Sequence, residues 1–358
     1  MNPYSVTGEY RQYLRQKYVL LGGMLLLLPV AFFLSITAGP VHIGSAEIIR
    51  ILLGGEAPDT HVRIIYHFRL PQSVAAVLAG AGLAISGASM QAVLRNPLCS
   101  PFTLGISGAA AFGAASVIFL RDGIVTATAI TATFAETTAF LPAGSVTAGA
   151  FLSAILATGL ILTLSGRRSA KPETIILIGV ALGAFYGAGT MMLQYFATER
   201  QLAAMVYWTF GDTQRANWYS VGIMSLFVAV SVIYFISQSR NYNTLALGEE
   251  NALSLGVPVR RMRLGTMFFA SLLTSVLVTS LGIIGFVGLV VPHTVRLWVG
   301  SDNRFVLLCS LVCGALLLLI ADTAARTITP GCQMPVSILT AFLGAPFFLL
   351  MLLNKSEV

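Results

Sequence analysis

The chain has 358 residues, of which 56% are hydrophobic and only 10% are charged, and its mean hydropathy is +0.83. Soluble domains carry about 25% charged residues, so the composition excludes an ordinary water-soluble protein and indicates a bundle of membrane helices. The net charge of +7 does not indicate nucleic-acid binding, because the basic residues are dispersed among apolar runs and form no stripe.

Ten apolar segments are predicted to cross the membrane, since ~30 Å of hydrocarbon takes about 20 helical residues. In chain order they are Tyr18–Ala38, Ser73–Leu94, Ile106–Leu120, Ser145–Leu164, Thr174–Phe196, Trp218–Ile236, Leu264–Leu281, Ile283–Val299, Phe305–Ala325 and Val336–Leu353. The Thr- and Ala-rich stretch Ile124–Leu141 contains Glu136 and is predicted to be an external loop, with an eleventh span there as the alternative. The sequence therefore predicts an all-α, polytopic transmembrane bundle of about ten helices.

The basic residues predict the orientation of these segments. With the N-terminus in the cytoplasm, fourteen of the 21 Lys and Arg residues fall inside and seven outside. Cytoplasmic loops carry the excess of positive charge, so both termini are expected in the cytoplasm. We expect a cytoplasmic tail over residues 1–17, a transmembrane domain over 18–353 and a C-terminal tail over 354–358.

The longest predicted cytoplasmic loop, Gln238–Arg263, differs from an ordinary linker. Its polar residues alternate with Leu245, Leu247, Leu253 and Leu255, and a glycine stands at each of two breaks. This pattern suits short amphipathic helices lying under the membrane. Exposed leucines favour a docking surface, and a solvated linker is the alternative.

Small residues recur at helical spacing in two predicted spans. Gly179, Gly183 and Gly187 follow one another every four residues. Gly80, Ala84 and Ala88 have the same spacing. Helices in lipid associate through close contact at small residues. These faces are therefore predicted to pack tightly, and the one from Gly179 to Gly187 is placed nearest a moving interface, with packing alone as the alternative.

Several kinds of chemistry are missing from the sequence. No lysine follows the glycines of a GxxxxGK phosphate loop, and no HExxH or GxSxG motif occurs. If ATP powers this protein, a separate chain hydrolyses it, so we expect no enzyme activity and no cofactor on this chain. Ion-coupled transporters need ionisable groups at mid-membrane, and among the 14 acidic residues only Asp322 maps inside a predicted span.

The cysteines and histidines are not predicted to form a metal site. Cys309 and Cys313 would share a helix face, but no His or carboxylate lies nearby in the sequence, so packing is the preferred interpretation. His42, His61 and His67 fall in one outer loop, where a solvated loop is preferred over contact with a metal chelate.

Three stretches resemble the FecCD family of ABC permeases for iron chelates and cobalamin. Arg69–Gly105 (RLPQSVAAVLAGAGLAISGASMQAVLRNPLCSPFTLG) is similar to the family's RLPR…GAxLAxSGxxMQ…NPLxxPxxLG. The second stretch is LALGEENALSLGV, and the third, Gly282–Phe347, contains GIIGFVGLVVPHTVRL and MPVSILTAFLGAPFF. Trp208–Gly211 (WTFG) fits the family's WxxG, and the motifs together span the chain from Arg69 to the C-terminus.

The resemblance implies a type II ABC importer permease in the inner (plasma) membrane. Two permeases, here expected as a homodimer, would pair around a central path. Two ATP-binding subunits would dock beneath and hold ATP and Mg, and a substrate-binding protein would dock outside. The GEE-containing loop would couple the ATP-binding subunits to the helices through Leu247, Gly248, Glu249, Glu250, Ala252, Leu255 and Gly256.

The family resemblance also suggests path and docking residues. The path would follow the predicted helix Ile175–Phe196, with Glu199–Trp208 helping to close its outer end. Its lining residues would be Gly179, Gly183, Gly187, Met191 and Gln194. Arg69 and Arg326 resemble outer arginines that meet acidic residues of the binding protein, with snorkelling toward water as the alternative. The family's second arginine in RLPR is Gln72 here, so one docking pair is lost or is replaced by Arg63 or His67.

The function expected from these residues is ATP-driven import of an iron chelate, either a ferric siderophore or haem. A cobalamin permease is the alternative within the family. An ion-coupled secondary transporter and an intramembrane enzyme are disfavoured, because the sequence lacks mid-membrane carboxylates and a catalytic constellation.

Overall fold

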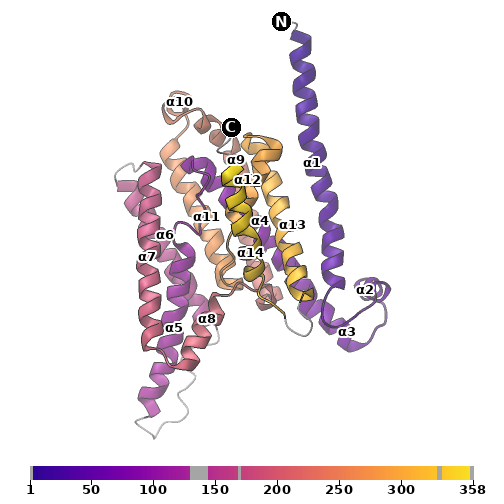
Figure 1. Ribbon diagram of the computed structural model, residues 1–358, viewed down its shortest axis with the longest axis vertical. Helices are drawn as coiled ribbons and strands as arrows, with labels where there is room; N and C mark the ends of the chain where they lie inside the picture. The colour runs from indigo at the N-terminus through magenta and orange to yellow at the C-terminus, as the bar shows by residue number, and fades with distance from the viewer. Residues whose placement is uncertain (1–2, 130–143, 168–170, 329–332, 355–358) are drawn as a thin grey trace.

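The computed structural model describes residues 3–129, 144–167, 171–328 and 333–354, which form a bundle of helices (Figure 1). The long helices are α1 (Pro3–Thr37), α4 (Leu70–Leu94), α5 (Ile106–Ala129), α6 (Ser145–Arg167), α7 (Pro172–Phe196), α9 (Trp218–Ala246), α11 (Val259–Leu281), α12 (Val287–Val299), α13 (Asn303–Thr327) and α14 (Val336–Asn354). The short ones are α2 (Ser45–Leu52), α3 (Asp59–Arg63), the π-helical turn η1 (Ile64–Arg69), α8 (Glu199–Thr209), the 3-10 turn η3 (Thr213–Arg215) and α10 (Glu249–Ser254).

Seven of the helices within the described residues are long and apolar enough to cross a membrane, and three shorter apolar helices accompany them. Every one of the ten predicted spans coincides with a helix, which confirms the all-α polytopic bundle. Hydropathy locates these helices because every backbone polar group must be bonded within the helix when no water is available.

Helices extend past the predicted limits in three places. Helix α1 begins at Pro3, so most of the predicted N-terminal tail is helical. Helix α5 continues to Ala129, so the start of the predicted external loop Ile124–Leu141 is helical, and its part beyond Ala129 lies outside the described residues. The predicted loop Gln238–Arg263 is largely helical, because α9 continues to Ala246 and α11 begins at Val259.

Local sequence signals set several helix starts. The side chain of Thr198 accepts from the backbone N–H of Gln201, whose side chain accepts in return, and this capping box starts α8. Asn217 and Ser220 form the same arrangement at the start of α9. Helix α7 has Pro172 in its first turn, where the missing N–H costs nothing.

Helix α4 lies at the centre of the bundle and packs against α9, α11, α12 and α13. In an apolar stretch of 18 residues from the span that contains it, 83% of the residues are buried, against 11% in α7 and 17% in α1. Glycines allow its closest contacts: a Cβ on Gly80 would lie 2.1 Å from the carbonyl oxygen of Gly314, and one on Gly87 would lie 1.7 Å from that of Gly288. The central position of α4 therefore depends on small residues.

The two ends of the bundle carry different elements (Figure 1). Both chain termini and α10 lie at one end, and α2, α3 and α8 lie at the other. Helices α6 and α7 form one lateral edge, and α1 forms the opposite edge. The predicted coupling segment is thus separated from the predicted docking residues by the length of the helices.

Candidate functional site

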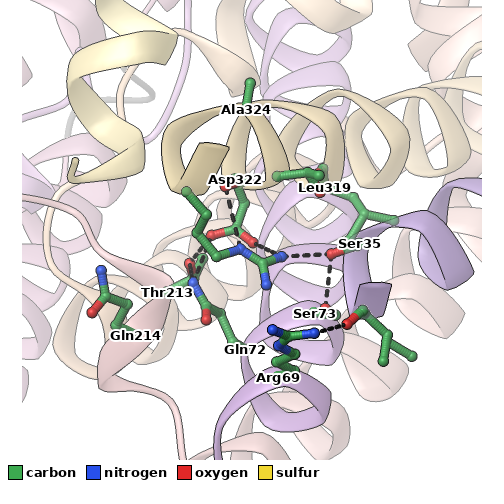
Figure 2. Close-up of polar contacts among 12 residues, drawn as sticks. Ser35, Arg69, Gln72, Ser73, Thr213, Gln214, Leu319, Asp322 and Ala324 are labelled. Atoms are coloured by element: carbon green, nitrogen blue, oxygen red, sulfur yellow. Dashed lines mark hydrogen bonds and ion pairs between the residues drawn. The ribbon is translucent and has the colours of Figure 1, made fainter. Parts of the chain in front are cut away.

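A buried polar network joins four elements near the end of the bundle that holds α2 and α3 (Figure 2). The Asp322 carboxylate on α13 accepts hydrogen bonds from Gln72 Nε2 at 3.1 Å and from the hydroxyl of Thr213 on η3. Its second oxygen lies 2.7 Å from Nη2 of Arg326, one helical turn further along α13. The same nitrogen donates to Ser35 Oγ on α1 at 2.6 Å. The network therefore connects α1, α4, η3 and α13.

Both members of this ion pair are withdrawn from solvent. The side chains of Asp322 and Arg326 are each 2% exposed. Taking a charge out of water costs several kcal/mol unless it is paired and hydrogen-bonded, and these two groups supply that pairing to each other. Asp322, the one acidic residue that mapped inside a predicted span, is therefore neutralised within the chain and is not a free carboxylate facing a path.

Arg69 binds the end of α1. Its guanidinium donates to the carbonyl oxygens of Ile36 (2.8 Å), Thr37 (3.2 Å) and Val41. The last carbonyls of a helix lack partners within the helix, and a basic side chain satisfies them and complements the helix dipole. Gly39 makes room for this arrangement, because a Cβ there would lie 2.9 Å from Arg69 Nη2. Arg69 thereby fastens the α1–α2 connection to the start of α4.

The expectation that Arg69 and Arg326 present exposed charges to a binding protein was wrong for this structure. Each residue is 4% exposed, and each donates to carbonyl, hydroxyl or carboxylate groups of this chain, although Nη1 of Arg326 has no partner among the described residues. Arg63, at the end of α3, is exposed, and so is His67. Gln72 points into the Asp322 network and is not part of the outer surface. A docking role for Arg63 stays a prediction.

The predicted coupling segment is a short helix between two glycine breaks. Gly248 has φ of +117° and Gly256 has φ of +80°, so the chain turns before and after α10 in a region that side chains disfavour. Leu247, Leu253 and Leu255 are 67%, 57% and 68% exposed, whereas Leu245 is fully buried at the end of α9. Three of the four predicted leucines therefore form an apolar surface at this end of the bundle.

The two glutamates of the coupling segment occupy different environments. Glu249 accepts a hydrogen bond from Nη2 of Arg263 on α11 at 2.9 Å, and that arginine side chain is only 8% exposed. Glu250 is exposed, and Ala252 is fully buried under α10. Glu249 and Ala252 thus hold α10 against the bundle, while Glu250 and Leu255 face outward.

A second polar contact at this end joins α9 to α13. Asn243 donates to Asp302 at 2.7 Å and accepts from the backbone N–H of Asn303, also at 2.7 Å. Burial raises the pKa of Asp302, but hydrogen bonds from Asn243 and Arg304 outweigh it and hold the pKa below its usual value. These hydrogen bonds join the last turns of α9, just before the predicted coupling segment, to the start of α13.

The predicted path helix divides into two faces. Gly179 and Gly183 pack against the backbone of Leu104 and Gly105, which precede α5. Gly179 is buried there and does not line an open path, which corrects that prediction. At Gly187 a Cβ would meet nothing within 4 Å, Met191 is 64% exposed, and Gln194 is half-buried. The last three residues stay candidates for the path.

Sequence reasoning missed three residues that organise these sites. Thr213 and Gln72 meet Asp322 from positions 109 and 250 residues away in the chain, and no local pattern reports such a pairing. Arg263 was counted only as a topology signal, although an acidic GEE segment followed by an arginine cluster was a visible sign of a possible ion pair. In the described part of the chain, no group of three or more His, Cys, Asp and Glu residues could hold a metal ion.

Comparisons with known proteins agree with this architecture. The model of the FecCD transport family matches residues 26–354. An ABC transporter permease of Methanocaldococcus jannaschii, named only provisionally, is 45% identical over 98% of each chain. The hemin transport system permease HmuU of Yersinia pestis is 34% identical over 96% of this chain and 97% of its own length. The vitamin B12 import permease BtuC of Vibrio cholerae is 35% identical over 82% of this chain and 84% of its own length.

A solved structure has the same fold. It is the inward-facing conformation of a transporter assigned provisionally to the metal-chelate ABC type, with a TM-score of 0.79 and 28% sequence identity over 93% of this chain and 98% of that one. The family match extends over nearly the whole membrane bundle and includes both the Asp322 network and α10. The chain therefore belongs to the FecCD transport family, as the non-catalytic, membrane-spanning permease subunit of an ABC importer.

Proposed function

We propose that this permease imports an iron chelate, either haem or a ferric siderophore. The observation that carries the proposal is the 34% identity to a hemin permease over nearly the full length of both chains. The similarity to a metal-chelate type transporter supports it. The energy would come from ATP hydrolysed by partner subunits, since the lysines of this chain lack a phosphate-binding loop.

In the proposed assembly, two copies of the chain pair and two ATP-binding subunits dock at the end that carries α10. That end would be cytoplasmic, as the excess of basic residues there suggests. The exposed Leu247, Leu253 and Leu255 would enter a cleft on the ATPase. The ion pair of Glu249 with Arg263 would then transmit the movement of α10 to α11. The binding protein would dock at the opposite end, where Arg63 is exposed.

The translocation path is proposed along the exposed face of α7. This helix is the least buried of the seven long spans within the described residues. Its free face includes the open position at Gly187, the exposed Met191 and the half-buried Gln194. A bulky chelate needs a wide and weakly binding path, and the open position at Gly187 beside the flexible Met191 meets that need, although the aromatic Phe185 and Tyr195 are also exposed on α7.

Cobalamin is the second candidate substrate. The observation that favours it is the 35% identity to the Vibrio cholerae vitamin B12 permease over 82% of this chain, against 34% identity to the hemin permease over 96%. Cobalamin is also a large metal chelate, so a wide path would serve it equally.

The deciding experiment is uptake into vesicles that contain this chain, its co-purifying ATPase and its binding protein. Radiolabelled haem, ferric siderophore and cobalamin are each offered with and without ATP. We expect ATP-dependent uptake of an iron chelate, which Glu249→Ala together with Glu250→Ala abolishes. Uptake of cobalamin alone would favour the second candidate. Uptake driven by an ion gradient without the ATPase would contradict an ABC mechanism.

A further inference from the structure

A cavity of about 240 Å³ lies beside the coupling segment, and α6, α7, α10 and α11 each contribute to its wall. Its polar lining consists of Ser165, Glu249, Arg260 and Arg263. The span of α6 ends here, at Gly166, and the span of α11 begins here, at Val259. The cavity therefore lies at the depth where the hydrocarbon region meets the lipid headgroups.

Two buried polar atoms of the residues that line this cavity lack partners among the described residues. They are Nε of Arg263 and Oγ of Ser165, in residues that are 7% and 4% exposed. A buried donor left without an acceptor costs about 1–3 kcal/mol. Both atoms are covered by protein, so this penalty favours a turn of the Arg263 and Ser165 side chains toward an acceptor in the cavity. Both of these groups can donate a hydrogen bond.

The charge balance of the cavity favours an anion. Arg260 and Arg263 bring two positive charges, and Glu249 brings one negative charge that is paired with Arg263. Arg260 donates to the carbonyl oxygen of Gly166 at 2.6 Å, which fixes its guanidinium at the rim. The cavity also lies at the first turns of α11, where unpaired backbone N–H groups and the helix dipole add positive potential.

The remaining wall is apolar, and an exposed leucine of the preceding helix α6 lies beside it. Leu253 and Leu264 line the cavity, and Leu253 is 57% exposed. Leu164, next to Ser165 in the chain, is 40% exposed. A ligand with a phosphate head and an acyl chain would match both halves of this environment, since basic pockets between membrane helices bind lipid headgroups.

We propose that this cavity binds a phosphate group, carried by an anionic lipid or free in solution, between Arg260, Arg263 and Ser165. The phosphate would share Arg263 with Glu249, and so would alter how firmly α10 is held against α11. Lipid composition would then tune the coupling segment. This inference does not depend on which chelate is transported.

The test uses the purified full-length chain in neutral detergent. Native mass spectrometry measures how much dioleoylphosphatidylglycerol or dioleoylphosphatidylcholine it retains, and thermal unfolding measures stabilisation by each lipid and by inorganic phosphate. Arg263→Gln removes the central donor, and Ser165→Leu fills the cavity while leaving both arginines. Arg261→Gln is the control, because Arg261 is exposed and does not line the cavity.

We expect the wild-type chain to prefer phosphatidylglycerol, and Arg263→Gln and Ser165→Leu to weaken its retention by about tenfold or more, as loss of a hydrogen bond to a charged group predicts. Arg261→Gln should bind as the wild type does. Glu249→Gln should bind more tightly, because it frees Arg263; a purely structural role for that ion pair would predict only lower stability.

Each outcome decides the proposal or the source of the phosphate. Stabilisation by inorganic phosphate alone, lost in Arg263→Gln, would identify free phosphate as the ligand. Preference for phosphatidylglycerol, lost in the same variant, would identify a lipid. Equal retention of both lipids and no effect of phosphate, or variants indistinguishable from Arg261→Gln, would overturn the proposal.

Discussion

Asp322 and Arg326 form a deeply buried ion pair. Their side chains are 2% exposed and 2.7 Å apart, and Gln72 and Thr213 complete the coordination of the carboxylate. Removing one partner of a buried ion pair leaves the other charge uncompensated, whereas removing both can be nearly neutral. The pair is therefore a structural connection whose loss should show in folding.

Asp322→Asn should lower the free energy of unfolding by about 3–5 kcal/mol, because Arg326 then stays buried without its counter-charge. Thermal unfolding in detergent measures the loss. Adding Arg326→Gln should recover part of it. Arg63→Gln is the matched control, since an exposed arginine should change stability by no more than about 0.5 kcal/mol. An unchanged unfolding temperature for Asp322→Asn would show that Arg326 finds another partner.

Glu249 and Glu250 of α10 should have different roles in transport. Glu249→Gln weakens the ion pair with Arg263, so ATP hydrolysis should continue while uptake falls several-fold. The effect on stability should be small, about 1 kcal/mol or less, because the Glu249 side chain is 44% exposed. Glu250→Gln should instead weaken binding of the ATPase, since Glu250 faces outward. The measurement compares uptake per ATP and ATPase co-purification. Identical behaviour of the two variants would contradict separate roles.

At the scale of elements, close helix packing rests on particular glycines and not on glycine content. On α4, a Cβ at Gly87 would lie 1.7 Å from the Gly288 carbonyl oxygen. On α7, a Cβ at Gly187 would meet nothing within 4 Å. The same residue type at the same helical spacing therefore serves contact in one helix and leaves a free surface in the other.

Gly87→Ala should force α4 and α12 apart and lower stability by about 1–3 kcal/mol or more, as overpacking does. Gly187→Ala should leave the unfolding temperature unchanged or slightly higher, because alanine favours the helix. Thermal unfolding of the two variants side by side tests this. If Gly187 borders the path, its variant should alter uptake alone. Equal losses of stability in both variants would contradict the distinction.

The sequence predicted the elements better than the contacts between them. Each span could be located because hydropathy and length follow from the bilayer, and the breaks at Gly248 and Gly256 appear in the structure with positive φ. Burial of Arg326 could not be predicted, because it depends on Gln72, Thr213 and Ser35, which only the folded bundle brings together. Arginines near a span end look alike in sequence, whether they meet solvent or a carboxylate.

At the scale of the whole molecule, the arrangement is that of a membrane bundle with two functional ends. Both termini and α10 share one end, and α2, α3 and α8 share the other (Figure 1). Termini on the same side require an even number of crossings, as the ten predicted spans do. From the positive-inside bias we propose that the α10 end is cytoplasmic, where the ATPase would reach the exposed leucines.

This orientation is testable with single cysteines in a background in which Cys99, Cys309, Cys313 and Cys332 are replaced. Ser254→Cys places an exposed thiol on α10, and Gln214→Cys places one on η3. In intact cells a membrane-impermeant maleimide should label Gln214→Cys, because η3 is expected outside, whereas Ser254→Cys should react only after permeabilisation. The reverse pattern would place α10 outside the cell, where no ATPase could drive it, and would contradict the proposed coupling.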